Sequence, residues 1–189
     1  MINCLITGVG GQGTVLASKL LAEAAMEEGY SVRTTETIGM AQRGGCVVSH
    51  VRMGETIYSP LIAKGQADMI ISFEPSEAVR LLPYLKKEGV MVVNTAPIKP
   101  IIRPEDYNYE TYITVLKEQV KHLKLVDGNS ICKACDEPRV LNIALLGAAI
   151  STKVIPISKE KIETIMRRKF KDRVVEINLK ALKLGIQEA

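Results

Sequence analysis

The sequence lacks tryptophan and contains only two phenylalanines, so aromatic residues make up just 4% of its 189 residues. Hydrophobic residues nevertheless reach 47%, and they are mainly the small and aliphatic side chains that fill buried parallel sheets. Charged residues account for 24%, a balance that excludes a disordered chain. We therefore expect one folded α/β domain that covers residues 1–189.

No apolar run is long enough to cross a bilayer, which requires about 20 residues. Even the apolar segment at residues 141–150 is interrupted by Asn142 and Gly147. The chain begins with a short apolar run that leads straight into a glycine loop, and it shows no cleavable signal segment. We therefore expect a cytoplasmic protein that has no contact with a membrane and whose thiols are reduced.

The positive charge is not arranged as a nucleic-acid surface. Many of the basic residues behind the formal net charge of +4 lie within residues 159–173. Acidic residues are interleaved with them, and no aromatic stacking platform for bases accompanies them. This pattern favours a solvated helix face, and we predict no nucleic-acid partner.

Neither the four cysteines nor the two histidines form a recognisable metal or catalytic set. Cys132 and Cys135 make a single CxxC pair, whereas a tetrahedral metal site needs two further ligands. The spacing of the other cysteines and of the histidines supplies none. His50 could act as an acid or base, because an ordinary histidine titrates near neutral pH, but its alternating sequence context favours a structural or interface role. We predict no metal site and no catalytic residue in this chain.

Hydrophobic periodicity gives the order of the elements. It places strands at residues 2–7, 30–37, 46–53, 56–59, 67–73 and 90–94. It places helices at residues 14–28, 75–87, 129–135, 141–152, 158–170 and 174–186, and it predicts a strand followed by a helix over 110–121. The strands at 46–53 and 56–59 flank Gly54 and Glu55 and so predict an antiparallel hairpin. The expected fold is a Rossmann-like, mostly parallel sheet with a β-hairpin insertion and a helical C-terminal region.

A glycine-rich loop follows the first predicted strand. The segment Gly8-Val9-Gly10-Gly11-Gln12-Gly13 satisfies the dinucleotide pattern GxGxxG at the start of a helix. Its glycines either let backbone N–H groups approach a phosphate or only permit close packing of helix on strand. Glu36, after the second strand, is a candidate ribose ligand, and the Gln12 amide can contact a ligand or a partner chain. Asn142 caps the helix that it opens or reaches this loop.

A second polar loop follows the second predicted strand and contains Gln42, Arg43, Gly44 and Gly45. The carboxyl edge of an open α/β sheet is where ligands bind. Arg43 can hold a carboxylate or phosphate through two parallel hydrogen bonds, while the glycines keep the backbone accessible. Taken alone, such a loop is equally typical of a surface turn with an exposed arginine.

The two loops belong to a wider set of motifs. The set comprises GVGGQG at 8–13, AQRGG at 41–45, VSHVR at 48–52, ADMIISFEPSEA at 67–78 and NIALLGA at 142–148. Together these motifs resemble the gamma family of pyruvate and 2-oxoacid:ferredoxin oxidoreductases, and the resemblance spans most of the chain. Within that family, the short free-standing form looks most like the indolepyruvate branch.

The resemblance implies an enzyme complex that oxidatively decarboxylates a 2-oxoacid, passes electrons to ferredoxin and releases an acyl-CoA. It places thiamine diphosphate, magnesium and iron-sulfur clusters in a larger partner subunit, with coenzyme A as cosubstrate. By residue matching, the family motif falls on Gly10, Gly11, Gln12 and Gly13 and on the second loop. The resemblance assigns these residues to an interface near the active site, without bond-breaking roles, and the isolated chain is expected to be inactive.

Two alternatives remain open at this point. The first is a stand-alone oxidoreductase that binds NAD or a flavin through Gly8, Gly10, Gly13 and Glu36. The second is an interaction protein that binds no ligand. An apolar patch on a subunit without its partner can also drive self-association, which would give a homodimer of the isolated chain.

Overall fold

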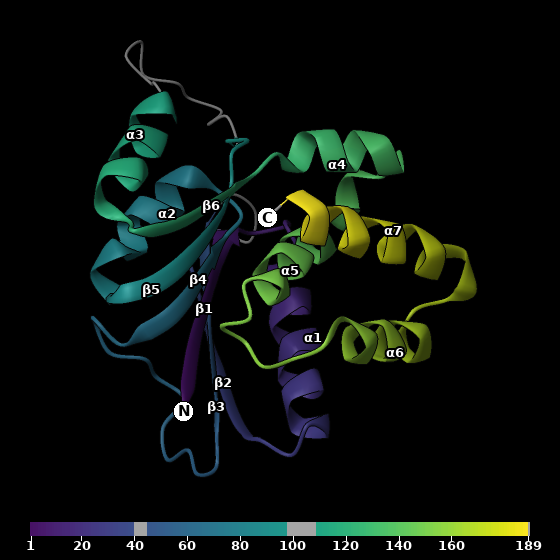
Figure 1. The fold of residues 1–189 in the computed structure, drawn as a ribbon, viewed down its shortest axis with the longest axis horizontal. Helices are drawn as coiled ribbons and strands as arrows, with labels where there is room; N and C mark the ends of the chain where they lie inside the picture. The colour runs from purple at the N-terminus through teal and green to yellow at the C-terminus, as the bar shows by residue number, and fades with distance from the viewer. Residues whose placement is uncertain (40–44, 98–108, 189) are drawn as a thin grey trace.

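The protein folds as a six-stranded sheet with helices on both faces (Figure 1). The structure is a computed structural model that describes residues 1–39, 45–97 and 109–188. Its strands are β1 (Ile2–Val9), β2 (Ser31–Ile38), β3 (Cys46–Gly54), β4 (Ala67–Ser72), β5 (Leu85–Asn94) and β6 (His122–Val126). Its helices are α1 (Thr14–Glu27), α2 (Pro75–Leu81), α3 (Tyr109–Gln119), α4 (Gly128–Cys135), α5 (Leu141–Ser151), α6 (Lys159–Lys169) and α7 (Asp172–Glu188). The predicted α/β class and helical C-terminal region are confirmed.

The strand order is β2-β3-β1-β4-β5-β6. The pairs β1–β4, β4–β5 and β5–β6 are parallel, whereas β3 runs antiparallel to both β1 and β2. Strand β3 therefore lies between the two strands of the predicted N-terminal βαβ unit. The carboxyl ends of β1, β4, β5 and β6 meet at one edge of the sheet, which we call the carboxyl edge.

The predicted hairpin is wrong in its second strand. Residues 56–59 form no strand, and β3 pairs instead with β2 along the register from Ser31 opposite Gly54 to Ile38 opposite Val47. A turn at Gly54 and Glu55 was compatible with either partner. The eight-residue β2 offers more ladder hydrogen bonds than a four-residue segment that ends at Pro60, because proline cannot donate to a sheet.

Two further boundaries differ from the prediction. Helix α2 ends at Leu81 and continues as a short 3-10 turn, η1 (Leu82–Tyr84), because Pro83 cannot extend an α-helix. Strand β5 consequently begins at Leu85 and not at residue 90. The segment predicted as strand then helix is helix α3 alone. It is followed by the unpredicted strand β6, a short edge strand in which His122 and Lys124 interrupt the apolar pattern.

The core has two layers. Helices α1 and α5 pack on one face of the sheet, with α7 packed against α5, and α2 and α3 lie on the other face (Figure 1). The apolar α5 is the most deeply buried helix, with every residue from Asn142 to Ile150 buried. It contacts α7 through Gly147 and Gly185, where a β-carbon on either glycine would collide with a backbone carbonyl of the facing helix. Within the described part of the chain, no helix is long and apolar enough to span a membrane.

His50 holds the connection that follows β3. The backbone N–H of Ile62 donates to His50 Nδ1 at 3.0 Å, and Arg52 Nη1 donates to the carbonyl of Ser59 at 2.7 Å. Burial, and secondarily the charge of Arg52, lowers the pKa of His50 below its usual value. The neutral imidazole is therefore the form that the fold requires, and this confirms a structural place for His50.

This geometry predicts a pH-dependent stability. Because the folded pKa of His50 is depressed, its contribution is complete above the ordinary value of 6.5 and is lost as the pH falls below that value. Asn at position 50 offers an oxygen acceptor in a similar place without a titratable ring. Between about pH 7.5 and about pH 5, the wild type should lose more unfolding free energy than His50→Asn. Urea titrations would measure both curves, and parallel curves would contradict this role.

Candidate functional site

The two glycine-rich loops meet at the carboxyl edge. The backbone N–H of Gly10, in the first loop, donates to the carbonyl of Gly45, the last residue of the second loop, at 2.8 Å. The second loop closes where Gly39 N donates to Cys46 O, also at 2.8 Å. Gln42, Arg43 and Gly44 lie outside the described residues. The structure thus joins the loops at Gly10 and Gly45, and the roles of Gln42, Arg43 and Gly44 stay predictions.

The glycines of the first loop serve different purposes. A β-carbon at Gly8 would lie 2.5 Å from Gln12 Oε1 and 2.8 Å from the β-carbon of Phe73, so Gly8 permits close packing. Gly13 has a φ of +84°, and a β-carbon there would lie 2.7 Å from Asn142 Nδ2. Gly11 has a φ of +101°, and no atom lies within 4 Å of the place its β-carbon would occupy. Packing thus explains Gly8 and Gly13, whereas Gly11 is open to an approaching group.

The Gln12 side chain folds back onto its own loop. Its Oε1 accepts a hydrogen bond from Val9 N at 2.7 Å, and its Nε2 donates to the Phe73 carbonyl at 3.2 Å. One donor and one acceptor of the amide are therefore used within the protein. A contact between Gln12 and a partner stays a prediction, and it would have to use the other N–H or the second lone pair of the amide.

Two buried asparagines support the same edge. Asn94, at the end of β5, donates from Nδ2 to the Phe73 carbonyl at 3.1 Å and accepts from Gly128 N at 3.2 Å. Asn142 is 4% exposed and packs against Gly13, whereas the residue that caps α5 is Val140, which makes no side-chain cap. Of the two alternatives for Asn142, the structure supports contact with the glycine loop. Sequence reasoning did not single out Asn94, because its partners Phe73 and Gly128 are far from it in the chain.

A largely apolar hollow of about 540 Å³ opens beside the first loop. It is lined by Gly10, Gly11, Gly13, Thr14, Val15, Leu16, Lys19 and Val47. Leu16 is 37% exposed, although most apolar residues of α1 are buried. Helix α1 begins at Gly13 without a side-chain cap and without an acidic residue in its first turn, so its positive end is not neutralised locally. This hollow, which we call the loop hollow, can receive an apolar group that neighbours a carbonyl or an anion.

A group of hydrogen-bonded polar side chains lies at the start of β3. Thr7 Oγ1 lies 3.3 Å from Glu77 Oε2, Arg80 Nε donates to the same carboxylate at 3.0 Å, and Arg80 Nη2 lies 2.7 Å from Cys46 Sγ. Burial is the main cause that raises the pKa of the Cys46 thiol, so this cysteine is not a ready nucleophile. Sequence reasoning missed this group of polar side chains, although Glu77 and Arg80 stand three residues apart in the FEPSEA segment and its continuation.

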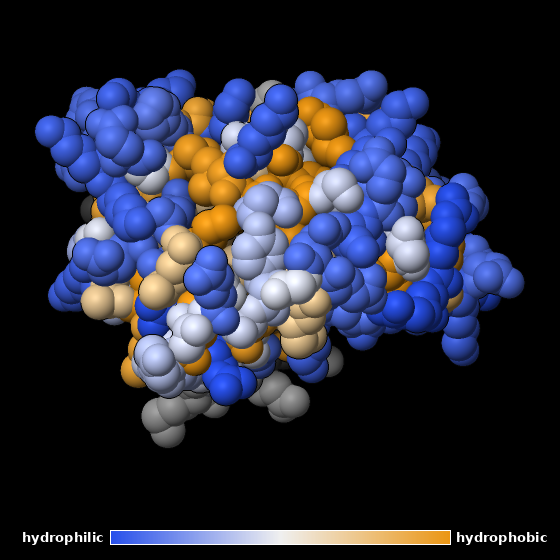
Figure 2. Space-filling model, turned by 60° about the horizontal axis from the view of Figure 1, so that its bottom comes forward, coloured by the Kyte–Doolittle hydropathy of each residue, from blue (hydrophilic) through white to orange (hydrophobic). Residues whose placement is uncertain are grey.

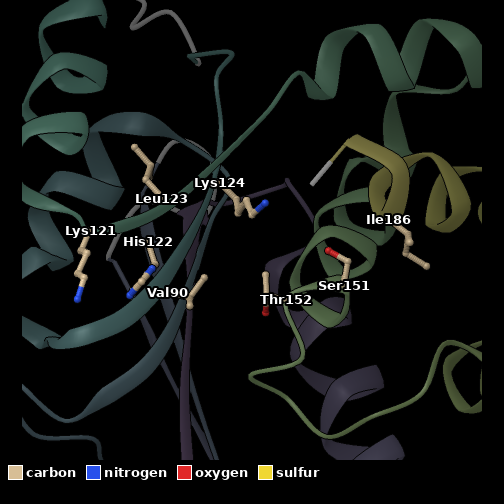
Figure 3. Close-up of a pocket in the computed structure, with 8 residues that line it drawn as sticks. All are labelled: Val90, Lys121, His122, Leu123, Lys124, Ser151, Thr152 and Ile186. Carbon is tan, nitrogen blue, oxygen red and sulfur yellow. The ribbon is translucent and has the colours of Figure 1, made fainter.

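A second hollow, of about 650 Å³, lies at the opposite edge of the sheet. Figure 3 shows its lining residues, which come from β5, β6, α5 and α7. Figure 2, which brings this edge forward, shows a hydrophobic patch enclosed by hydrophilic side chains. Glu88 binds Lys121 at 2.6 Å and His122 at 3.3 Å, and the hydroxyl of Thr152 donates to the Ala149 carbonyl. Because these polar groups are already paired, we regard the carboxyl edge as the functional site despite its smaller hollow.

The described residues contain no group of three or more histidine, cysteine or acidic side chains that could hold a metal ion. All four cysteines are free thiols. Cys132 and Cys135 both lie in α4, where burial is the main cause that raises the pKa of each thiol. Neither cysteine is thus a stable thiolate, which is the form that redox or metal chemistry requires.

The strand order places Glu36 too far from the first glycine loop to bind the ribose of a dinucleotide there. Glu36 pairs with Ser49 of β3, and Ser49 pairs in turn with Ile6 of β1. Two strand spacings, about 10 Å, therefore separate Glu36 from β1. In a dinucleotide-binding βαβ unit the acidic residue ends the strand next to the glycine loop. Here β3 occupies that neighbouring position.

With this geometry established, the comparisons with known proteins define the class. The model of the pyruvate ferredoxin/flavodoxin oxidoreductase family matches residues 3–188, so the chain belongs to this family. The indolepyruvate oxidoreductase subunit IorB of Thermococcus kodakarensis is 37% identical over 196 residues, covering 99% of this chain and 95% of the relative. The common gamma subunit of the Pyrococcus abyssi pyruvate/ketoisovalerate oxidoreductases is 33% identical over 194 residues, covering 100% and 97%. The resemblance drawn from the motifs is confirmed.

Solved structures show the same architecture. The gamma subunit of a keto/oxoacid ferredoxin oxidoreductase from Geobacter sulfurreducens has a TM-score of 0.74 at 25% identity, covering 100% of this chain and 98% of that chain. The 2-oxoglutarate:ferredoxin oxidoreductase of Magnetococcus marinus has a TM-score of 0.76 at 20% identity. The match covers all of this chain but only 31% of the longer one. The fold therefore occurs both as a separate subunit and as part of a longer polypeptide.

Proposed function

We propose that this chain is the small subunit of a 2-oxoacid:ferredoxin oxidoreductase complex, with indolepyruvate or a related aryl pyruvate as substrate. The observation that carries the proposal is the hydrogen bond between Gly10 and Gly45, which unites two family motifs at one edge of the sheet. The relatives named for indolepyruvate support the substrate class. A match to part of a longer chain supports a fold that works beside other domains.

In this proposal the chain contributes a docking rim and no bond-breaking group. The rim consists of the first glycine loop, the loop hollow and the second loop. The larger subunit carries thiamine diphosphate, magnesium and iron-sulfur clusters, which supply decarboxylation and electron transfer to ferredoxin, and coenzyme A accepts the acyl group. The described residues fit this division, because they form no metal-binding group and contain no low-pKa cysteine.

The residues of this chain bind and orient the larger subunit. The uncapped start of α1 presents backbone N–H groups, and Leu16 presents an apolar surface next to them. We assign Gln42, Arg43 and Gly44 to the same rim, with Arg43 holding a carboxylate or phosphate group. The hollow is left exposed when the partner is absent, so the isolated chain should self-associate through it.

Reconstitution tests the proposal directly. The chain purified alone should show no 2-oxoacid oxidation with ferredoxin or a dye, and adding the larger subunit should produce turnover. Copurification from the native source, followed by iron and thiamine analysis, should recover both cofactors with the partner. Turnover by the isolated chain would contradict the proposed function.

A substitution at Arg43 tests whether the rim takes part in turnover or only holds the two subunits together. Arg43→Lys keeps the charge but cannot make two parallel hydrogen bonds, so turnover of the complex should fall about tenfold while assembly persists. Sedimentation would measure assembly separately from turnover. Arg33→Lys, the same exchange at an exposed arginine near the start of β2, should change neither. Equal turnover in the two variants would remove Arg43 from the site.

The NAD- or flavin-binding alternative makes a distinct prediction. Because β3 separates Glu36 from the glycine loop, the isolated chain should bind NAD, NADP, FAD and FMN only weakly. Isothermal titration calorimetry would decide the matter. A dissociation constant in the micromolar range would favour the stand-alone enzyme.

A further inference from the structure

Asn94 occupies an unusual position for an uncharged polar residue. It is 2% exposed, and it ends β5 at the carboxyl edge. Its side chain makes three hydrogen bonds: Nδ2 donates to the Phe73 carbonyl and to the Ala96 carbonyl, each at 3.1 Å, and Oδ1 accepts from Gly128 N at 3.2 Å. Both N–H groups and one of the two lone pairs of the amide are thus used within the protein.

The Phe73 carbonyl is the point at which this network reaches the glycine loop. It accepts a hydrogen bond from Asn94 and another from Gln12 Nε2, while Phe73 N donates to the Thr7 carbonyl at 2.8 Å. Gln12 in turn accepts from Val9 N. The backbone of Phe73 therefore connects β1 and the end of β5 with the loop between β1 and α1.

We propose that Asn94 is a positioning residue that, through the Phe73 carbonyl and Gln12, fixes the first glycine loop in the place where it meets the larger subunit. The inference rests on the proposed function. Asn94 and Gln12 donate to the same carbonyl oxygen, so Asn94 holds in place the acceptor that the Gln12 side chain uses. Asn94 also holds the start of α4 through Gly128, so it links the loop to a second helix terminus at the same edge.

The replacement Asn94→Asp tests this role without a change of shape. Aspartate retains an acceptor for Gly128 N, but it replaces the Nδ2 donor with an oxygen that faces the Phe73 carbonyl. In the complex reconstituted with saturating larger subunit, kcat should fall about tenfold at neutral pH, with the KM for the 2-oxoacid unchanged. Asn129→Asp, the same exchange at an exposed residue of α4, should retain wild-type kcat.

The pH profile distinguishes positioning from a general loss of structure. Burial raises the pKa of the new carboxyl, and the protonated acid can again donate to the Phe73 carbonyl. The ratio of the Asn94→Asp kcat to the wild-type kcat should therefore rise as the pH falls. A lowered ratio that stays flat across pH would assign Asn94 a structural role only, and an unchanged kcat would exclude both roles.

A double-variant cycle tests the shared carbonyl. Gln12→Glu removes the other donor, so the combined variant should lose little more kcat than either single variant. If the kcat losses of the two single variants multiply in the double variant, Asn94 and Gln12 are not coupled through the Phe73 carbonyl.

One measurement does not depend on the partner. In the isolated chain, Asn94→Asp should accelerate amide hydrogen exchange at Val9 and Gly10, and Asn129→Asp should not. If exchange changes as expected but the wild-type complex shows no turnover, the proposed function fails and the positioning stands. If the complex is active and exchange is unchanged, the positioning inference fails alone.

Discussion

Gly185→Ala is expected to lower the free energy of unfolding by about 3 kcal/mol, although alanine favours helices over glycine by about 1 kcal/mol. The added β-carbon in α7 would collide with the Ala144 carbonyl oxygen and would lie 2.7 Å from the carbonyl carbon. These are backbone atoms of the buried α5, so neither can rotate away. The two helices would have to separate, which opens the interior of the core.

Urea unfolding followed by circular dichroism measures this effect. Lys183→Ala, at an exposed position of the same helix, is the matched control, and its unfolding free energy should stay within about 0.5 kcal/mol of the wild type. Gly147→Ala should resemble Gly185→Ala, because its β-carbon would meet the Leu182 carbonyl. A Gly185→Ala protein as stable as the control would show that α5 and α7 can move apart freely.

Gly13→Ala is expected to reduce turnover of the reconstituted complex at least about tenfold more than Gly11→Ala. Both glycines have positive φ, so both alanine variants carry a similar backbone strain of about 1 to 2 kcal/mol. Only the β-carbon at Gly13 would also meet Asn142, at 2.7 Å. Relief of that collision would shift the start of α1 and with it the loop hollow.

The pair controls for strain, because the substitution and the backbone region are the same. Asn142→Ser in the Gly13→Ala background should recover part of the lost turnover, since serine removes the amide that collides. Similar losses for Gly13→Ala and Gly11→Ala, or no recovery in the double variant, would mean that contact with Asn142 does not place the loop.

The first glycine loop shows which structural features a short motif predicts and which it does not. The pattern GxGxxG predicted a strand, a turn and a helix, and these elements are present as β1, the loop and α1. The same pattern suggested dinucleotide binding, which depends on the identity of the neighbouring strand. That neighbour is the antiparallel β3, and the identity of a neighbouring strand is a long-range choice that local spacing does not encode.

The hairpin and α2 illustrate the same limit. Alternation predicted a strand over Cys46 to Met53 but could not choose between partners on either side of it. The register with β2 is fixed by the pairing of two complete strands. The helix predicted at residues 75–87 is longer than α2, because the apolar pattern continues past Pro83 into residues that belong to β5. Periodicity detects burial, and burial is common to both structures.

Local periodicity and short motifs were enough to predict the α/β class, most helices, the two glycine-rich loops and the family. Three features emerge only in the folded chain: β3 separates β1 from β2, Gly10 meets Gly45, and Asn94 and Gln12 share the Phe73 carbonyl. Each of these joins segments far apart in the chain. Such contacts form only where the packing of the whole sheet brings the partners within hydrogen-bond distance.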